Sequence, residues 1–127
     1  MEQRGFLFLD DSHERYMNFL AWIEGFFYGY AIDVEWVKTY DECIQQLTKS
    51  HWDTLCLDHD LGTEKTGYDV AKWIEEKVFT DNDFIPPAQV IVHTANTIGR
   101  KAIVDALVKI NTKVEVEIDV RTFDAYH

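Results

Sequence analysis

Residues Thr54–Val70 read TLCLDHDLGTEKTGYDV, and this stretch decides how the chain folds. Its apolar run, Leu55–Leu57, is too short for a helix and is typical of a buried strand. The run ends at three polar residues, Asp58, His59 and Asp60, and a glycine-containing loop then leads into a helical pattern. Open α/β sheets place their ligand sites where strands deliver polar groups into such loops. The stretch therefore predicts a parallel α/β sheet with a site at its carboxyl edge.

Two further segments have the same form. Phe6–Leu9 ends at Asp10-Asp11, and Val90–Val92 ends at His93-Thr94. If the three strands are parallel neighbours, these polar side chains converge on one edge of the sheet.

The burial pattern of the expected strands predicts their order. The first, third and fourth are wholly apolar, as in strands covered on both faces, whereas the second and fifth alternate apolar and polar residues, as edge strands do. This indicates a flavodoxin-like, doubly wound five-stranded parallel sheet of order 2-1-3-4-5, with its site between the first and third strands. The chain has no room for a helix after the last strand, so we predict a single domain over residues 1–127 that lacks the last helix. The expected strands are 5–9, 32–37, 54–57, 89–92 and 114–120.

Composition excludes several classes of function. A formal charge of −11 argues against a sequence-independent grip on nucleic acid, which depends on Lys and Arg. No apolar run approaches the roughly 18 residues that a membrane helix needs, and no signal peptide is recognisable. Cys43 and Cys56 lie in a predicted helix and strand without metal-type spacing, which indicates reduced thiols. We therefore expect a cytoplasmic protein without membrane partners.

The acidic residues at the strand ends form a candidate metal site. Asp10, Asp11 and Asp58, with Asp60 beside them, offer oxygen ligands of the kind that Mg²⁺ or Mn²⁺ prefers. The alternative is that one member of the Asp pair only caps the following helix.

Two histidines stand at adjacent strand ends. Because histidine ordinarily titrates near neutrality, His59 and His93 could act as general base and general acid on a phosphodiester. Either could instead only hydrogen-bond an aspartate. Thr94 and Asn96 offer donors to phosphate oxygens, and Arg121 offers a charge, although a surface role for this arginine is equally open.

The layout resembles the receiver domain of two-component response regulators. Asp10-Asp11 fall on the acidic pair of that family, Asp58 on its phosphoacceptor, and Thr94-Ala95 on its Thr-Ala switch. Arg121-Thr122-Phe123 replace the Lys-Pro-Phe of receivers, and histidines 59 and 93 replace apolar residues.

A narrower relative, the receiver-like family named for cyclic-phosphate processing, is more similar. The segments that carry the resemblance are Leu9-Asp10-Asp11, Leu57–Gly62 with Thr66-Gly67, and His93–Gly99. The resemblance implies a metal-supported phosphoesterase for cyclic or terminal phosphates, of a small nucleotide or an RNA end, in phage or bacterial conflict systems. Asp58, His59 and His93 would be its catalytic residues.

Three hypotheses remain open. The chain is a phosphoesterase, a signalling switch phosphorylated on Asp58, or a non-catalytic nucleotide binder. The two histidines favour the first over the second, and nothing in the sequence separates the first from the third.

Overall fold

The computed structural model describes residues 3–124, which alternate between strands and helices. The elements are β1 (Gln3–Leu9), α1 (His13–Phe26), β2 (Ala31–Val37), α2 (Tyr40–Lys49), β3 (Thr54–Leu57), α3 (Gly67–Thr80), β4 (Gln89–Val92), α4 (Thr97–Asn111) and β5 (Glu117–Val120).

All five strands are parallel and lie in the order β2-β1-β3-β4-β5, as predicted. Phe8 of β1 is in register with Trp36 of β2 on one side and Cys56 of β3 on the other. The carboxyl ends of β1, β3 and β4 therefore reach the same edge of the sheet, which is the condition for a shared site.

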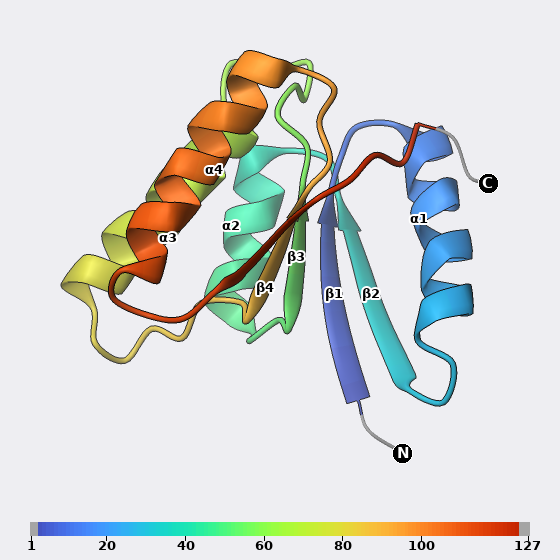
Figure 1. The fold of residues 1–127 in the computed structure, drawn as a ribbon, viewed down its shortest axis with the longest axis horizontal. Coiled ribbons are helices and arrows are strands. Elements are labelled where there is room, and N and C mark those ends of the chain that lie inside the picture. The colour runs from blue at the N-terminus through green and yellow to red at the C-terminus, as the bar shows by residue number, and fades with distance from the viewer. Residues whose placement is uncertain (1–2, 125–127) are drawn as a thin grey trace.

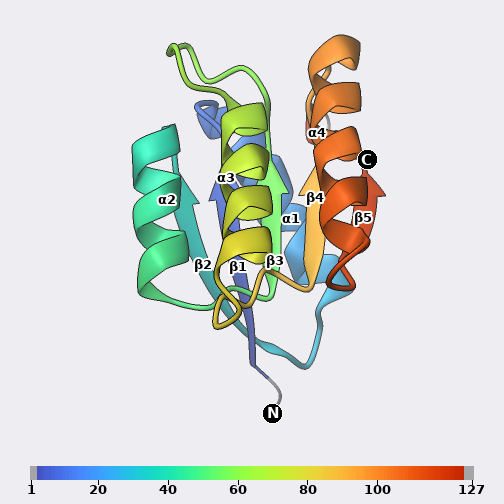
Figure 2. The ribbon, with the colours of Figure 1, turned by 90° about the vertical axis from the view of Figure 1, so that its left-hand side faces the viewer.

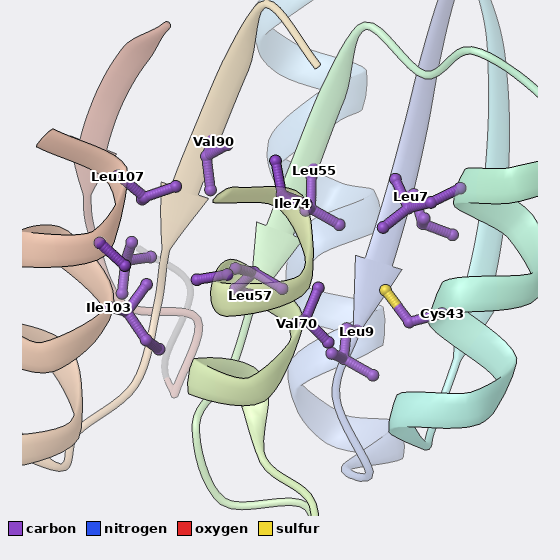
Figure 3. Close-up of a cluster of buried hydrophobic side chains, with 14 of the residues drawn as sticks. Leu7, Leu9, Cys43, Leu55, Leu57, Val70, Ile74, Val90, Ile103 and Leu107 are labelled. Atoms are coloured by element: carbon purple, nitrogen blue, oxygen red, sulfur yellow. The ribbon is translucent and has the colours of Figure 1, made fainter. Parts of the chain in front are cut away.

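Helices cover the two faces of the sheet unequally (Figures 1 and 2). α2, α3 and α4 lie on one face, and α1 alone lies on the other. The larger core fills the space under α2, α3 and α4, where aliphatic side chains of the central strands meet those of the helices (Figure 3). Leu7, Leu55, Leu57, Ile74 and Ile103 are all at most 1% exposed there. These central strands are apolar because both of their faces are covered.

The second core, under α1, is aromatic. Phe8 stacks on Phe19 of α1 with ring centroids 4.4 Å apart, and Phe6 meets Phe19 edge-on. Phe123, only 2% exposed, packs against Phe19 and Trp22. No helix follows β5 within residues 3–124, and the segment 121–124 instead crosses to α1 (Figure 1).

Three helices begin directly after a capping residue. The side chains of Ser12, Thr39 and Asn96 each accept a hydrogen bond from a backbone N–H in the first turn of α1, α2 and α4. These bonds satisfy donors that a helix start otherwise leaves free.

The predicted start of the last strand is wrong, since β5 begins at Glu117 and not at Val114. The Val114 N–H bonds the Ile110 carbonyl, and the Val116 N–H bonds the Asn111 side chain, so these two N–H groups bond to the end of α4 and not to β4. The neighbouring strand β4 starts at Gln89, which pairs with Glu117. Residues before Glu117 therefore have no partner in β4.

No helix within residues 3–124 is long and apolar enough to cross a membrane. Cys43 and Cys56 are free and fully buried, which fits the predicted thiols.

Candidate functional site

The site is built on the residues that directly follow three strands. The N–H of Asp10 bonds the Val37 carbonyl, that of Asp58 bonds Leu9, and that of His93 bonds Leu57, at 3.0–3.1 Å. The sheet hydrogen bonding thus continues one residue beyond β1, β3 and β4. These side chains are held by the sheet itself rather than by a loop.

Arg15, in the first turn of α1, occupies the centre of the site. Its Nε and Nη2 donate to the two carboxylate oxygens of Asp10, at 2.7 and 2.9 Å. Nη2 also lies 3.5 Å from Asp58 and 3.6 Å from Asp11, and Nη1 lies 3.5 Å from Asp124. The hydrogen bond and charge of Asp10 raise the pKa of Arg15 further above its usual value. We call the four aspartates around Arg15 the carboxylate cage.

Asp10 is completely buried and is fixed by further contacts. Its Oδ1 also accepts the Ser12 N–H at 2.8 Å, and its backbone carbonyl accepts the indole N–H of Trp36 on β2, also at 2.8 Å. The carboxylate therefore keeps its place at the floor of the cage.

His93 lies beside Asp10 in an apolar setting. Its ring stacks on Phe8, with centroids 4.8 Å apart, and meets the Phe123 edge. It is 1% exposed, neither ring nitrogen has a hydrogen-bond partner in the described chain, and Nδ1 is 3.6 Å from Asp10 Oδ2. Burial, and then the charge of Arg15, lower its pKa to about 3. His93 is therefore a neutral imidazole near pH 7.

Asp58 is also buried, at 4% exposure. Its pKa is raised to about 7, first by burial and then by the charge of Asp10; Arg15, the His59 backbone N–H and the Thr94 hydroxyl oppose this rise. Without a further cation, the Asp58 carboxyl is partly protonated near neutrality.

His59 forms a separate polar group with two neighbours. Its Nδ1 lies 2.9 Å from Asp60 Oδ1, and the Asn96 amide donates to Asp60 Oδ2 at 3.3 Å. The hydrogen bond to His59 lowers the pKa of Asp60. The ring rests on Gly99 of α4, where an added Cβ would lie 2.5 Å from it. The carboxylate favours the Nδ1–H tautomer and leaves Nε2 as the acceptor.

A second close approach sets the position of α3. A Cβ on Gly67 would lie 1.8 Å from the Asp58 carbonyl oxygen, which is a backbone atom and cannot rotate away. The Gly67 N–H bonds the His59 carbonyl at 3.0 Å. The start of α3 is therefore packed directly on the end of β3.

These groups surround a pocket of about 180 Å³ at the carboxyl edge of the sheet. Its lining residues are Arg15, Asp58, Asp60, His93, Thr94, Ala95, Asn96 and Asp124.

The model of the cyclic-phosphate processing receiver domain family matches residues 6–109, from β1 to the last turn of α4. The chain belongs to this family. No curated protein matches it.

Solved receiver domains share the fold of this cyclic-phosphate receiver domain. The response regulator TrrA of Thermotoga maritima, in complex with Mg²⁺ and BeF, is 23% identical, with a TM-score of 0.58 over 95% of this chain and 89% of its own. The receiver domain of a putative LuxO repressor from Vibrio parahaemolyticus is 24% identical, with a TM-score of 0.63 over 93% and 78%. The non-phosphorylated HemR receiver domain of Leptospira biflexa is 19% identical, with a TM-score of 0.62 over 98% and 84%.

The cyclic-phosphate receiver domain brings most of the predicted site residues to one edge. Asp10 and Asp58 lie side by side at the floor, and Thr94 lines the pocket with its hydroxyl accepting the Asn96 N–H. Asp11 and Asp60 stand at the rim, with side chains 42% and 65% exposed. Their predicted role as metal ligands remains a prediction.

Arg121 lies elsewhere. Its guanidinium stacks 4.4 Å from the Trp22 ring centroid and 5.5 Å from that of Phe123, and it is not part of the pocket lining. The arginine that lines the pocket is Arg15, and the predicted phosphate-binding role of Arg121 remains a prediction.

Arg15 and Asp124 are site residues that sequence reasoning missed. Asp11 and Arg15 are four residues apart at a helix start, a spacing at which opposite charges meet. This signal was available for Arg15. Asp124 follows the last strand and is recognisable only once residues 121–124 are seen to turn toward α1.

The donor set fits a divalent cation. One ligand atom each of Asp10, Asp58 and His93 lies within 4.8 Å of the other two, and all three residues are buried. The two unpartnered nitrogens of His93 support this, because a neutral imidazole with a free lone pair is a common metal ligand. These three residues would hold the ion.

Proposed function

We propose that this chain is a metal-supported phosphoesterase that acts on cyclic or terminal phosphates, of a small nucleotide or an RNA end. The observation that carries the proposal is the His59–Asp60 pair, of which Asp60 lines the same pocket as Arg15, Asp58 and His93. Membership of a family described as cyclic-phosphate processing supports it.

In this proposal, water attacks phosphorus, so that one P–O bond forms while the P–O bond to the leaving oxygen breaks, and solvent water gives that oxygen its proton. His59 takes the proton from water through Nε2, since Asp60 holds Nδ1 and stabilises the imidazolium that results. Thr94 and the N-terminus of α4 face the phosphate oxygens from the pocket wall. Bound Mg²⁺ or Mn²⁺ would neutralise phosphate charge and orient the attacking water.

The role of His93 differs from our expectation from sequence. With a pKa of about 3, its imidazole is neutral and does not carry the proton that a general acid must give to the leaving oxygen. We therefore propose His93 as a ligand next to Asp10, and its predicted acid–base role remains a prediction.

A panel of linear and cyclic nucleotides and cyclic-phosphate RNA ends, with and without Mg²⁺, tests the activity. We expect His59→Ala to lower turnover about 10²–10⁴-fold, the usual contribution of one general acid or base. His51→Ala is the matched control, because His51 is exposed just before the opposite end of β3. Unchanged turnover in His59→Ala, or no turnover of any panel member by the wild type, contradicts the proposal.

The second candidate is a switch phosphorylated on Asp58. Asp58 follows β3 and lines the pocket, and a response regulator of Burkholderia pseudomallei with this fold carries a phosphorylated aspartic acid and a calcium ion. Accumulation of an acid- and base-labile acyl phosphate on Asp58 would favour the switch. Tight binding of a nucleotide without turnover would favour a non-catalytic binder.

A further inference from the structure

The carboxylate cage already contains a cation, the guanidinium of Arg15. Asp10, buried at the floor, uses both oxygens to accept from Arg15. Asp58 faces Nη2 of the same group and Asp124 faces its Nη1, each at 3.5 Å. Arg15 therefore compensates the negative charges that would otherwise attract a metal ion.

The hydrogen bonds to Asp10 leave one lone pair, on Oδ2, for an ion beside Arg15. Oδ1 accepts the Ser12 N–H and Arg15 Nη2, which uses the two lone pairs of that oxygen. Oδ2 accepts Arg15 Nε at 2.7 Å and faces His93 Nδ1 at 3.6 Å. An ion between Asp10, Asp58 and His93 needs the Oδ2 lone pair and would lie beside a positive guanidinium, which repels it.

Arg15 also has alternative carboxylate partners outside the floor of the cage. Its side chain is 28% exposed, and the carboxylates of Asp11 and Asp124 stand at the rim with 42% and 52% exposure. A rotation of the side chain toward these two groups keeps the guanidinium paired while it leaves Asp10.

We propose that Arg15 and a divalent cation are alternative occupants of the carboxylate cage, so that metal binding requires Arg15 to leave Asp10. The inference rests on the metal-binding part of the proposed function and not on hydrolysis. The site then has a closed form, with Arg15 on Asp10, and a metal-bound form, with Arg15 at the rim, where its guanidinium is free to meet a phosphate oxygen.

The test compares Mn²⁺ binding, measured without substrate by the electron paramagnetic resonance of free Mn²⁺, in the wild-type chain and Arg15→Gln. We expect Arg15→Gln to bind Mn²⁺ at least about tenfold more tightly, because it no longer pays for displacing the guanidinium. Its melting temperature in EDTA should fall, because Asp10 then keeps a buried charge without a partner.

Arg4→Gln is the matched control, since it removes the same charge at the opposite end of β1, where the guanidinium lies 5.3 Å from the Phe27 ring. It should leave Mn²⁺ affinity at the wild-type value. Equal or weaker Mn²⁺ binding by Arg15→Gln overturns the inference but does not contradict the proposed metal site. Absence of Mn²⁺ binding in every variant overturns both, whereas the turnover assays judge the phosphoesterase proposal separately.

A measurement on the wild type covers the case in which Arg15→Gln does not fold. The NMR signal of the Arg15 Nε–H reports its bond to Asp10. Saturation with Mg²⁺ should shift this signal to that of a solvent-exposed guanidinium. An unchanged signal at Mg²⁺ saturation overturns the inference.

Discussion

Two buried groups in the pocket respond to pH in opposite directions. The pKa of Asp58 is raised from 3.8 to about 7, so the folded chain holds this proton more tightly than the unfolded chain does. The stability that this group contributes is complete below about pH 4 and is lost as the pH rises through about 7. The pKa of His93 is lowered from 6.5 to about 3, so its contribution is complete above 6.5 and is lost as the pH falls toward 3.

Asp58→Asn should therefore gain stability over the wild type as the pH rises. Asparagine fills the same space and cannot ionise, so the cost of a buried charge disappears. Thermal unfolding in EDTA should show a melting-temperature difference, variant minus wild type, that grows from about pH 4 to about pH 8. His93→Phe provides the opposite case, with a difference that grows as the pH falls. A pH-independent difference for Asp58→Asn would show that its carboxyl titrates normally.

Among the elements, the segment 121–124 has the most unusual role, because it covers the sheet face where no helix follows β5 in the described chain. Phe123 packs on Phe8, Phe19 and Trp22, and its carbonyl accepts the Asn18 amide at 2.7 Å. One aromatic side chain thus completes the core under α1.

Phe123→Ala should destabilise the fold by about 3–5 kcal/mol, the usual cost of emptying a buried Phe site. Urea unfolding measures the loss. Tyr28→Ala, at an aromatic residue that is 93% exposed, should change stability by no more than about 0.5 kcal/mol. Similar small effects in both variants would show that segment 121–124 is not part of the core.

The sequence predicted most elements because burial and capping leave local marks. The expected strands 54–57 and 89–92 match β3 and β4, and Ser12, Thr39 and Asn96, which cap helices, are of residue types that favour this position. The prediction of where β5 starts was wrong, because the alternation of apolar and polar residues begins at Val114, among residues whose N–H groups bond to the end of α4.

The site was predictable as far as strand register determines it. Asp10 and Asp58 meet because β1 and β3 are parallel neighbours, a consequence of strand order. The directions of Arg15 and Arg121 depend on rotamers and on long-range packing. The Arg121 side chain covers the Trp22 ring and does not line the pocket.

At the scale of the whole molecule, a net charge of −11 affects any metal experiment. Salt of any kind screens repulsion between surface carboxylates, so Mg²⁺ can raise the melting temperature without occupying the cage. A specific site adds stabilisation that depends on the ligand concentration relative to its dissociation constant.

Millimolar Mg²⁺ or Mn²⁺ should raise the melting temperature beyond the effect of potassium chloride at equal ionic strength. Binding to the folded state alone causes this excess, and Asp58→Asn should reduce it. Differential scanning calorimetry measures both. An excess of zero, or one that Asp58→Asn retains in full, would count against a site between Asp10, Asp58 and His93.

Arg15 joins the beginning and the end of the described chain, through Asp10 on one side and Asp124 on the other. During synthesis the N-terminal strands leave the ribosome first, and residues 121–124 emerge after all five strands. Until then the nascent chain lacks Phe123, which covers Phe19 and Trp22, and Asp124, which faces Arg15. The pocket is thus finished last, and a prematurely terminated chain would present an open aromatic surface to chaperones and proteases.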